Sequence, residues 1–158
     1  MIIHNHEQGT QEWFDCRKGK MTASNATAIG NAWKWLNTYI KELMARYYSS
    51  GQEQSYSNLH IDRGNELEPI ARSMYELKTG TTVEQVWFCE FDEYIGCSPD
   101  GLIWDDWGIE IKCQDDKKHF WMLLGEWIDS SYIRQIQMNL YVTGRKWRDF
   151  VSYNPNYK

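Results

Sequence analysis

The stretch that most constrains this chain is the segment from residue 94 to residue 113, YIGCSPDGLIWDDWGIEIKC. It predicts two strands of a hairpin, with Asp100 carried by the first strand and residues 109–113 forming the second. The second strand alternates apolar and charged residues with the period of a β-strand. This alternation places Glu110 and Lys112 on one face and the three apolar residues on the other.

If Asp100 lies beside that polar face, two carboxylates and an ammonium group converge on one point. Two carboxylates suit Mg²⁺, which prefers oxygen ligands and keeps several waters. A lysine beside the metal can orient a water and stabilise developing negative charge, which is the chemistry of phosphodiester cleavage. The same letters are also typical of a half-buried strand whose Glu110 and Lys112 are solvated, preceded by a simple Ser-Pro-Asp-Gly turn.

Length and composition narrow the class of protein. The 158 residues are enough for one domain with a sizeable core, and we expect residues 1–158 to form a single nuclease domain. The net charge of −5 argues mildly against nucleic-acid binding, although basic residues cluster near positions 17–20, 117–119 and 145–148. Nine tryptophans and ten tyrosines fit either a well-filled core or a surface that stacks on bases or sugars.

Four cysteines occur, and none forms a Cys-x-x-Cys pair, so we expect reduced thiols and no zinc. No stretch is long and apolar enough to span a membrane, and the first residues lack a signal-peptide pattern. The sequence therefore predicts a cytoplasmic protein.

Hydrophobic periodicity and capping residues predict helices, then a run of strands, then two helices and a last strand. This order favours an α/β (α+β) domain with helices against a mixed central sheet. The expected helices are 11–17, 22–29, 33–50, 59–77, 116–124 and 132–142, and the expected strands are 2–3, 83–91, 94–98, 102–104, 109–113 and 147–153. Pro69 is expected to kink the fourth helix or to begin a new segment within it.

Three further groups of polar residues are candidate site residues. Arg17 can form a fork with a phosphate, and the hydroxyls of Thr22 and Ser24 would lie at a helix N-terminus, where anions are favoured. An ordinary surface arginine and an ordinary helix cap give the same pattern. Two acids, Glu66 and Glu68, follow Gly64. Two glutamines, Gln135 and Gln137, flank the apolar stripe of the helix at 132–142. These acids and amides are equally consistent with solvated or structural side chains.

The order Pro99, Asp100, a short hairpin, Glu110, one residue and Lys112 resembles the PD-(D/E)xK nuclease signature. Five stretches together resemble the phage lambda exonuclease type of viral recombination nuclease, a branch of that superfamily with a restriction-endonuclease-like core. They cover nearly the whole chain in the family's order: residues 9–24, 64–72, 96–101, 108–113 and 132–141 with the strand that follows.

The resemblance implies a metal-dependent exonuclease that degrades one strand of double-stranded DNA from its 5′ end. It implies that Asp100, Glu110 and the Ile111 carbonyl bind the metal, with two Mg²⁺ ions expected and Mn²⁺ as a substitute. Lys112 would be the catalytic lysine. On α-helical positions, the resemblance places Glu68 in the active site in preference to Glu66, and Gln135 facing it, with Gln137 as the less favoured substitute. It also implies that Arg17 binds the terminal 5′ phosphate. The hydroxyl groups expected near this phosphate are those of Thr22, Ser24 and Ser98.

The resemblance also implies a location inside a bacterial or phage-infected cell and partners: DNA ends, and a single-strand annealing protein. Family members form a ring-shaped trimer through residues that follow the final strand. Because this sequence stops at Lys158, we expect a monomer or weak oligomer, with the trimeric ring as the alternative. Two other functions stay open, a PD-(D/E)xK endonuclease of the restriction or junction-cleaving type, and a non-catalytic module that binds DNA ends or carbohydrate.

Overall fold

A computed structural model of the chain describes residues 1–31, 33–49, 59–125 and 128–157. The expected loop at 51–58 lies outside these residues. Helices and strands follow one another in the order β1 (Ile2–His4), α1 (Gln11–Arg17), β2 (Met21–Thr22), η1 (Ala23–Asn25), α2 (Ala26–Gly30), α3 (Lys34–Tyr48), α4 (Leu59–Thr79), β3 (Phe88–Glu90), β4 (Ile95–Cys97), β5 (Gly101–Ile103), β6 (Trp107–Cys113), α5 (Asp116–Leu123), α6 (Ser130–Thr143) and β7 (Trp147–Tyr153). The α/β class is therefore confirmed.

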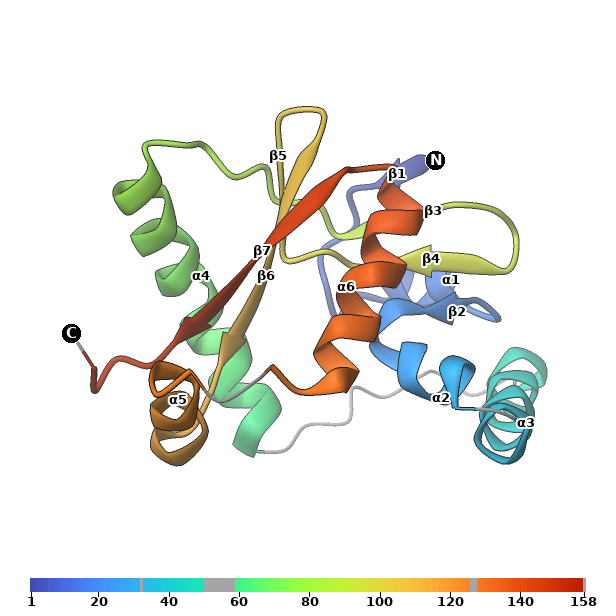
Figure 1. The fold of residues 1–158 in the computed structure, drawn as a ribbon. Helices are drawn as coiled ribbons and strands as arrows, with labels where there is room; N and C mark the ends of the chain where they lie inside the picture. Colours follow the sequence, from blue (N-terminus) through green and yellow to red (C-terminus); the bar gives the residue numbers. More distant parts are fainter. Residues whose placement is uncertain (32, 50–58, 126–127, 158) are drawn as a thin grey trace.

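The strands divide between two mixed sheets (Figure 1). The first has the order β1-β3-β4-β2, with β4 antiparallel to β3 and parallel to β2. The second has the order β5-β6-β7, in which β6 is antiparallel to β5 and parallel to β7. The predicted hairpin is β5–β6, with Gly101 opposite Ile109. An isolated bridge between Glu84 and Leu102 extends the pairing beyond β5.

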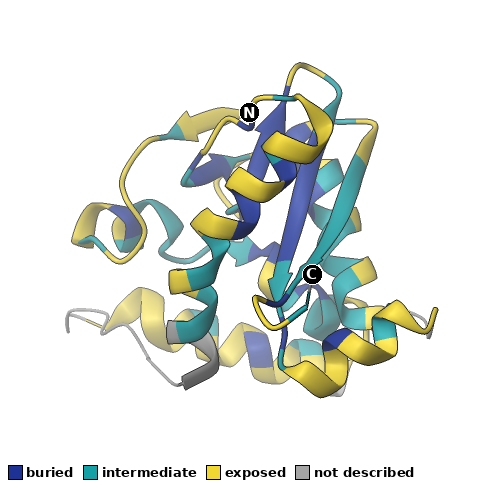
Figure 2. Ribbon diagram, turned by 90° about the vertical axis from the view of Figure 1, so that its left-hand side faces the viewer, coloured by how far each residue is buried: buried dark blue, intermediate teal, exposed yellow. Residues whose placement is uncertain are grey.

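Helices α4 and α6 lie on opposite sides of the second sheet, as Figure 1 shows. The apolar face of β6 packs against α4 in a cluster of buried side chains: Ala71, Tyr75, Val83, Ile103, Ile109 and Ile111. Its other face carries Glu110 toward α6. The strands β5 and β6 are the most buried part of the second sheet (Figure 2). Two faces of opposite chemistry on one strand thus follow from the alternation in the sequence.

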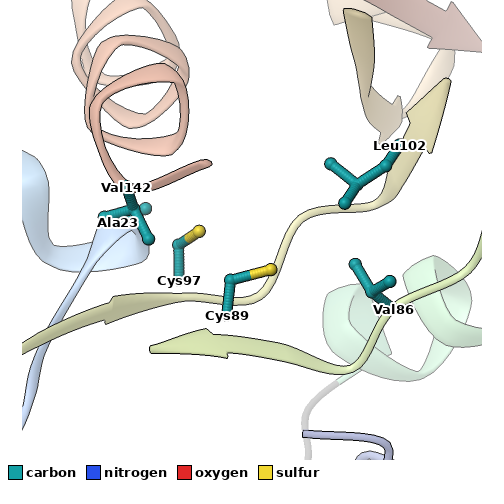
Figure 3. Close-up of a cluster of buried hydrophobic side chains, with 6 residues drawn as sticks. All are labelled: Ala23, Val86, Cys89, Cys97, Leu102 and Val142. Carbon is teal, nitrogen blue, oxygen red and sulfur yellow. The ribbon is translucent and has the colours of Figure 1, made fainter. Parts of the chain in front are cut away.

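A second apolar cluster joins the two sheets to α6. Figure 3 shows its residues, which come from η1, from β3 and the segment before it, and from β4, β5 and α6: Ala23, Val86, Cys89, Cys97, Leu102 and Val142. Cys89 and Cys97 lie opposite each other on β3 and β4, and both are free thiols that fill space as small apolar groups. This cluster places the segment before Asp100 against the N-terminal part of the chain.

Side chains cap the N-termini of α1, α5 and α6. The Thr10 side chain accepts a hydrogen bond from the Trp13 amide, and the Asp115 and Asp129 side chains accept from the amides of Lys118 and Ser131. Each cap satisfies an amide that has no partner inside its helix. None of the described helices is long and apolar enough to cross a membrane.

Three local expectations differ from the structure. Pro69 does not begin a new segment, because α4 runs through it as one helix, and Asn65, whose carbonyl loses its helical donor there, is exposed to water. The strand expected at 83–91 is reduced to β3 and a single bridge from Glu84 to Leu102, and the Val83 amide donates to Glu76 Oε1 (2.7 Å). Thr22 belongs to β2, and one 3-10 turn precedes α2.

Candidate active site

The hairpin β5–β6 fixes Asp100 beside β6. Asp100 directly precedes β5, and its Oδ2 accepts a hydrogen bond of 2.6 Å from the Ile111 amide. The next residue, Gly101, packs tightly against its neighbours, because a Cβ atom there would lie 2.2 Å from Val83 Cγ1 and 3.1 Å from Ile109 Cγ1. The Asp100 carboxylate is therefore held next to the stretch of β6 that carries Glu110 and Lys112.

Glu110 is fully buried, with 0% of its surface exposed. Its Oε1 accepts from Lys112 Nζ at 2.6 Å, and its Oε2 accepts from Asn139 Nδ2 at 2.9 Å. Arg148 Nη1 lies 3.7 Å from the same Oε2. Burial, and then the negative charge of Asp100, raise the pKa of Glu110 to about 7, against the opposing effect of Lys112.

The Lys112 side chain is mostly buried, with 21% of its surface exposed. Burial lowers its pKa, but the charges of Glu110 and Asp100 more than offset this, so its pKa is raised above the ordinary lysine value. Its Nζ also lies 5.4 Å from the centre of the Tyr132 ring. Lys112 is thus a fixed positive charge, suited to stabilising negative charge rather than to accepting a proton.

Helix α4 adds a third carboxylate. Glu68 Oε1 accepts from Arg72 Nη2 at 2.6 Å, and Arg72 Nε donates to the Asp100 carbonyl at 3.2 Å. Burial, and then the Asp100 charge, raise the pKa of Glu68 to about 7. Glu66 is exposed and lines none of the described cavities around the site. The two acids of α4 are therefore separated by their helix faces, with Glu68 on the side of Asp100.

Glu68, Asp100 and Lys112 line a cavity of about 330 Å³, whereas the buried Glu110 lies outside its lining. Its lining is Gly64, Asn65, Glu68, Asp100, Ile111, Lys112, Cys113, Gln114, Asp115, Lys118 and Tyr132. Among the described residues, no three Asp, Glu, His or Cys side chains form a complete metal-ligand set. Mg²⁺ needs only one or two carboxylates because it keeps waters, and a buried carboxylate pair gains from a neutralising cation, so the oxygen groups present fit this ion.

Arg17 lies at a second, smaller cavity of about 130 Å³, together with Thr22, Lys20 and Arg46. Its guanidinium stacks 4.0 Å from the centre of the Trp13 ring, and its Nη1 donates to Ser98 Oγ at 2.5 Å. Ser98 lies two residues before Asp100, so a short stretch of chain connects the side chain that contacts Arg17 with the Asp100 carboxylate.

Of the remaining predicted residues, Thr22 and Gln135 are buried or half-buried, whereas Ser24 and Gln137 are exposed to solvent. The Oγ atoms of Thr22 and Ser24 are 3.2 Å apart, and Asn25 Nδ2 donates to Thr22. Thr22 is buried and lines the Arg17 cavity, whereas Ser24 is exposed and outside its lining. On α6, Gln135 is half-buried and shares a helix face with Asn139 and Tyr132, while Gln137 is exposed.

Three further side chains contact the carboxylates and were not predicted from the sequence: Asn139, Arg148 and Arg72. Asn139 occupies a position where the helix spacing calls for an apolar residue, which is the one signal in the sequence that could have marked it. Arg148 belongs to a strand whose partner was unknown. Its contact with Glu110 depends on β7 pairing in parallel with β6.

The chain is similar to known proteins in sequence and in fold. A family model described as a YqaJ-like viral recombinase domain matches residues 12–146. The alkaline exonuclease LHK-Exo from Laribacter hongkongensis is 36% identical, with a TM-score of 0.85 over 94% of this chain and 76% of that chain. Its complex with dAMP matches with 37% identity, the same TM-score and the same coverage.

A phage related exonuclease from Haemophilus somnus 129PT shares the fold, with 21% identity and a TM-score of 0.66 over 85% of this chain and 68% of that chain. Among curated proteins, no sequence matches the chain.

Proposed function

Because this chain belongs to the YqaJ-like viral recombinase family, we propose that it is a metal-dependent exonuclease that degrades one strand of double-stranded DNA from the 5′ end. The observation that carries the proposal is the buried Glu110–Lys112 pair beside Asp100. A solvated Glu–Lys pair on a strand would be exposed, whereas here the carboxylate has no exposed surface. The similarity to an alkaline exonuclease supports the same reaction.

Asp100, Glu110 and the Ile111 carbonyl are the groups that would hold Mg²⁺, as one or two ions. Bound Mg²⁺ would lower the pKa of a coordinated water and neutralise charge on the scissile phosphate. Lys112 stabilises the negative charge that develops on the phosphate oxygens, because its ammonium is held at the cavity. Glu68, with a pKa of about 7, can accept a proton near neutral pH.

Arg17 and Ser98 would select the DNA end. An arginine fork makes a directional, charge-assisted contact with a terminal phosphate that a hydroxyl end cannot replace. Thr22 lines the same cavity and can add a hydroxyl contact, while Gln135 would position a water or phosphate from α6. Removing the strand that begins with this phosphate leaves a 3′ single-stranded overhang, the form of DNA that a single-strand annealing protein takes up.

The test is digestion of end-labelled duplexes with and without a 5′ phosphate, in the presence and absence of Mg²⁺. We expect Mg²⁺-dependent release of 5′-terminal nucleotides, faster from phosphorylated ends, and no cleavage of covalently closed circles. Cutting of closed circles would establish an endonuclease instead. Binding to DNA ends without cleavage in Mg²⁺ or Mn²⁺ would leave only a binding module.

A further inference from the structure

Glu110 is held from behind by two side chains that do not reach the cavity. Its Oε2 accepts from Asn139 Nδ2 at 2.9 Å and lies 3.7 Å from Arg148 Nη1. Asn139 belongs to α6 and Arg148 to β7, so two separate elements converge on one oxygen atom. All three side chains have no exposed surface.

Asn139 and Arg148 each satisfy only part of their hydrogen-bonding groups in this position. Within the described part of the chain, Asn139 Oδ1 and Arg148 Nε and Nη2 find no partner. Burying such groups is unfavourable unless another interaction compensates. Apart from the Ile109 carbonyl, which accepts from Arg148 Nη1 at 2.7 Å, the partner that their donors reach is the carboxylate of Glu110.

The neighbouring strand leaves room for this arrangement. Gly108 lies opposite Arg148 in the β6–β7 register. A Cβ atom at position 108 would lie 3.1 Å from Arg148 Nη2 and 3.2 Å from its Cζ, so a larger residue would push against the guanidinium. The absence of a side chain at Gly108 lets Arg148 lie across β6 toward Glu110.

The two oxygens of Glu110 therefore have different surroundings. Oε1 faces Lys112, which lines the cavity, whereas Oε2 faces the interior groups. We propose that Asn139 and Arg148 are positioning residues that fix Oε2, so that Oε1 is the atom Glu110 presents to the metal. This rests on the proposed function, in which Glu110 is a metal ligand. When Mg²⁺ binds, only the hydrogen bond between Glu110 Oε1 and Lys112 would be replaced. The contacts of Oε2 with Asn139 and Arg148 would remain.

The decisive variant is Asn139→Leu, which has the same number and branching of side-chain heavy atoms and cannot donate to Glu110. Isothermal titration of the metal-free, full-length protein with Mg²⁺ should show an affinity about 10- to 100-fold weaker than wild type, the usual effect of removing a group that orients a metal ligand. The Mg²⁺ concentration for half-maximal nuclease activity should rise in parallel, while KM for DNA at saturating Mg²⁺ stays unchanged.

Thr143→Val is the matched control. Thr143 is buried on the same helix, and its Oγ1 donates to the Asn139 carbonyl at 2.7 Å without contacting Glu110. This variant should lower the thermal stability and leave Mg²⁺ affinity unchanged. A merely structural role for Asn139 predicts that both variants behave alike.

The outcomes separate the two proposals. If the wild-type protein fails to bind Mg²⁺, the proposed metal site is wrong. If wild type binds and folded Asn139→Leu binds equally well, only the positioning role is overturned. Should Asn139→Leu fail to fold, NMR on the wild type decides: the Asn139 side-chain amide protons should stay protected from exchange at saturating Mg²⁺, and their loss of protection would refute the inference.

Discussion

The affinity of this protein for Mg²⁺ should depend steeply on pH. Burial and the charge of Asp100 raise the pKa values of Glu110 and Glu68 to about 7, so both carboxyls are largely protonated in mildly acidic solution without metal. A cation that binds the ionised carboxylates must displace these protons. Protons and Mg²⁺ therefore compete within the pH range of ordinary assays.

The size of the effect follows from the titration curve. A carboxyl with a pKa of about 7 is about 90% ionised at pH 8 and about 90% protonated at pH 6. Displacing one proton weakens the apparent Mg²⁺ affinity about 10-fold between pH 8 and pH 6, and displacing two weakens it about 100-fold. The change in apparent Mg²⁺ affinity per pH unit thus shows whether Glu68 loses its proton together with Glu110.

Stability should change in the opposite direction without metal. Because the folded pKa of Glu110 lies above its ordinary value of 4.5, its contribution to stability is fully present below about pH 4.5 and is lost as the pH rises through 7. The thermal midpoint of the metal-free protein should therefore fall between pH 5 and pH 8. Added Mg²⁺ should restore more stability at pH 8 than at pH 6.

Calorimetric titration at pH 6, 7 and 8, in buffers of different ionisation enthalpy, measures both affinity and the number of protons released. Thermal unfolding with and without Mg²⁺ supplies the stability half of the test. Glu110→Gln is the control, since an amide has no proton to displace and its residual Mg²⁺ binding should depend less on pH. An equal Mg²⁺ affinity at pH 6 and pH 8 in the wild-type protein would refute the reasoning.

Three further predictions concern single residues. Lys112→Ala should reduce turnover by at least ~10²-fold, the scale for one preorganised charge, while Mg²⁺ binding measured by calorimetry persists. Arg17→Ala should narrow the rate difference between 5′-phosphate and 5′-hydroxyl duplexes, and an unchanged ratio in an end-labelling assay would contradict its role. Ile109→Ala, at a position with no exposed surface, should lower the free energy of unfolding by about 2–5 kcal/mol in urea titrations.

Local sequence patterns and capping residues predicted several of the elements that carry the site. Strand β7 begins and ends at the expected residues 147 and 153, and α1 at 11 and 17. The alternation of β6 also predicted which face holds Glu110 and Lys112. Where the outcome depended on a distant partner, the pattern failed: residues 83–87 look like a strand, but the Val83 amide bonds to the α4 side chain of Glu76.

The contacts around the carboxylates were harder to foresee for the same reason. Asp100 is adjacent to Ile111 through a hairpin, which a local pattern can indicate. Asn139 and Arg148 reach Glu110 only because α6 covers the polar face of β6 and β7 pairs with it in parallel. A repeat of two or of 3.6 residues indicates a strand or a helix but not which other element it packs against. No local pattern could therefore assign these side chains to the site.

Burial distinguishes the two interpretations of the sequence Ile-Glu-Ile-Lys-Cys, which are a strand of an active site and an ordinary half-solvated strand. On an edge or half-solvated strand, Glu110 and Lys112 would keep their water and contribute little to stability. Here the carboxylate has no exposed surface and a raised pKa, and three separate elements supply the donors that surround it. Such an arrangement lowers the stability of the metal-free protein at neutral pH, because an ionised group must be kept out of water. If the cavity binds Mg²⁺ as proposed, the cation would neutralise this charge, and the stability lost in the metal-free protein would reappear as binding affinity.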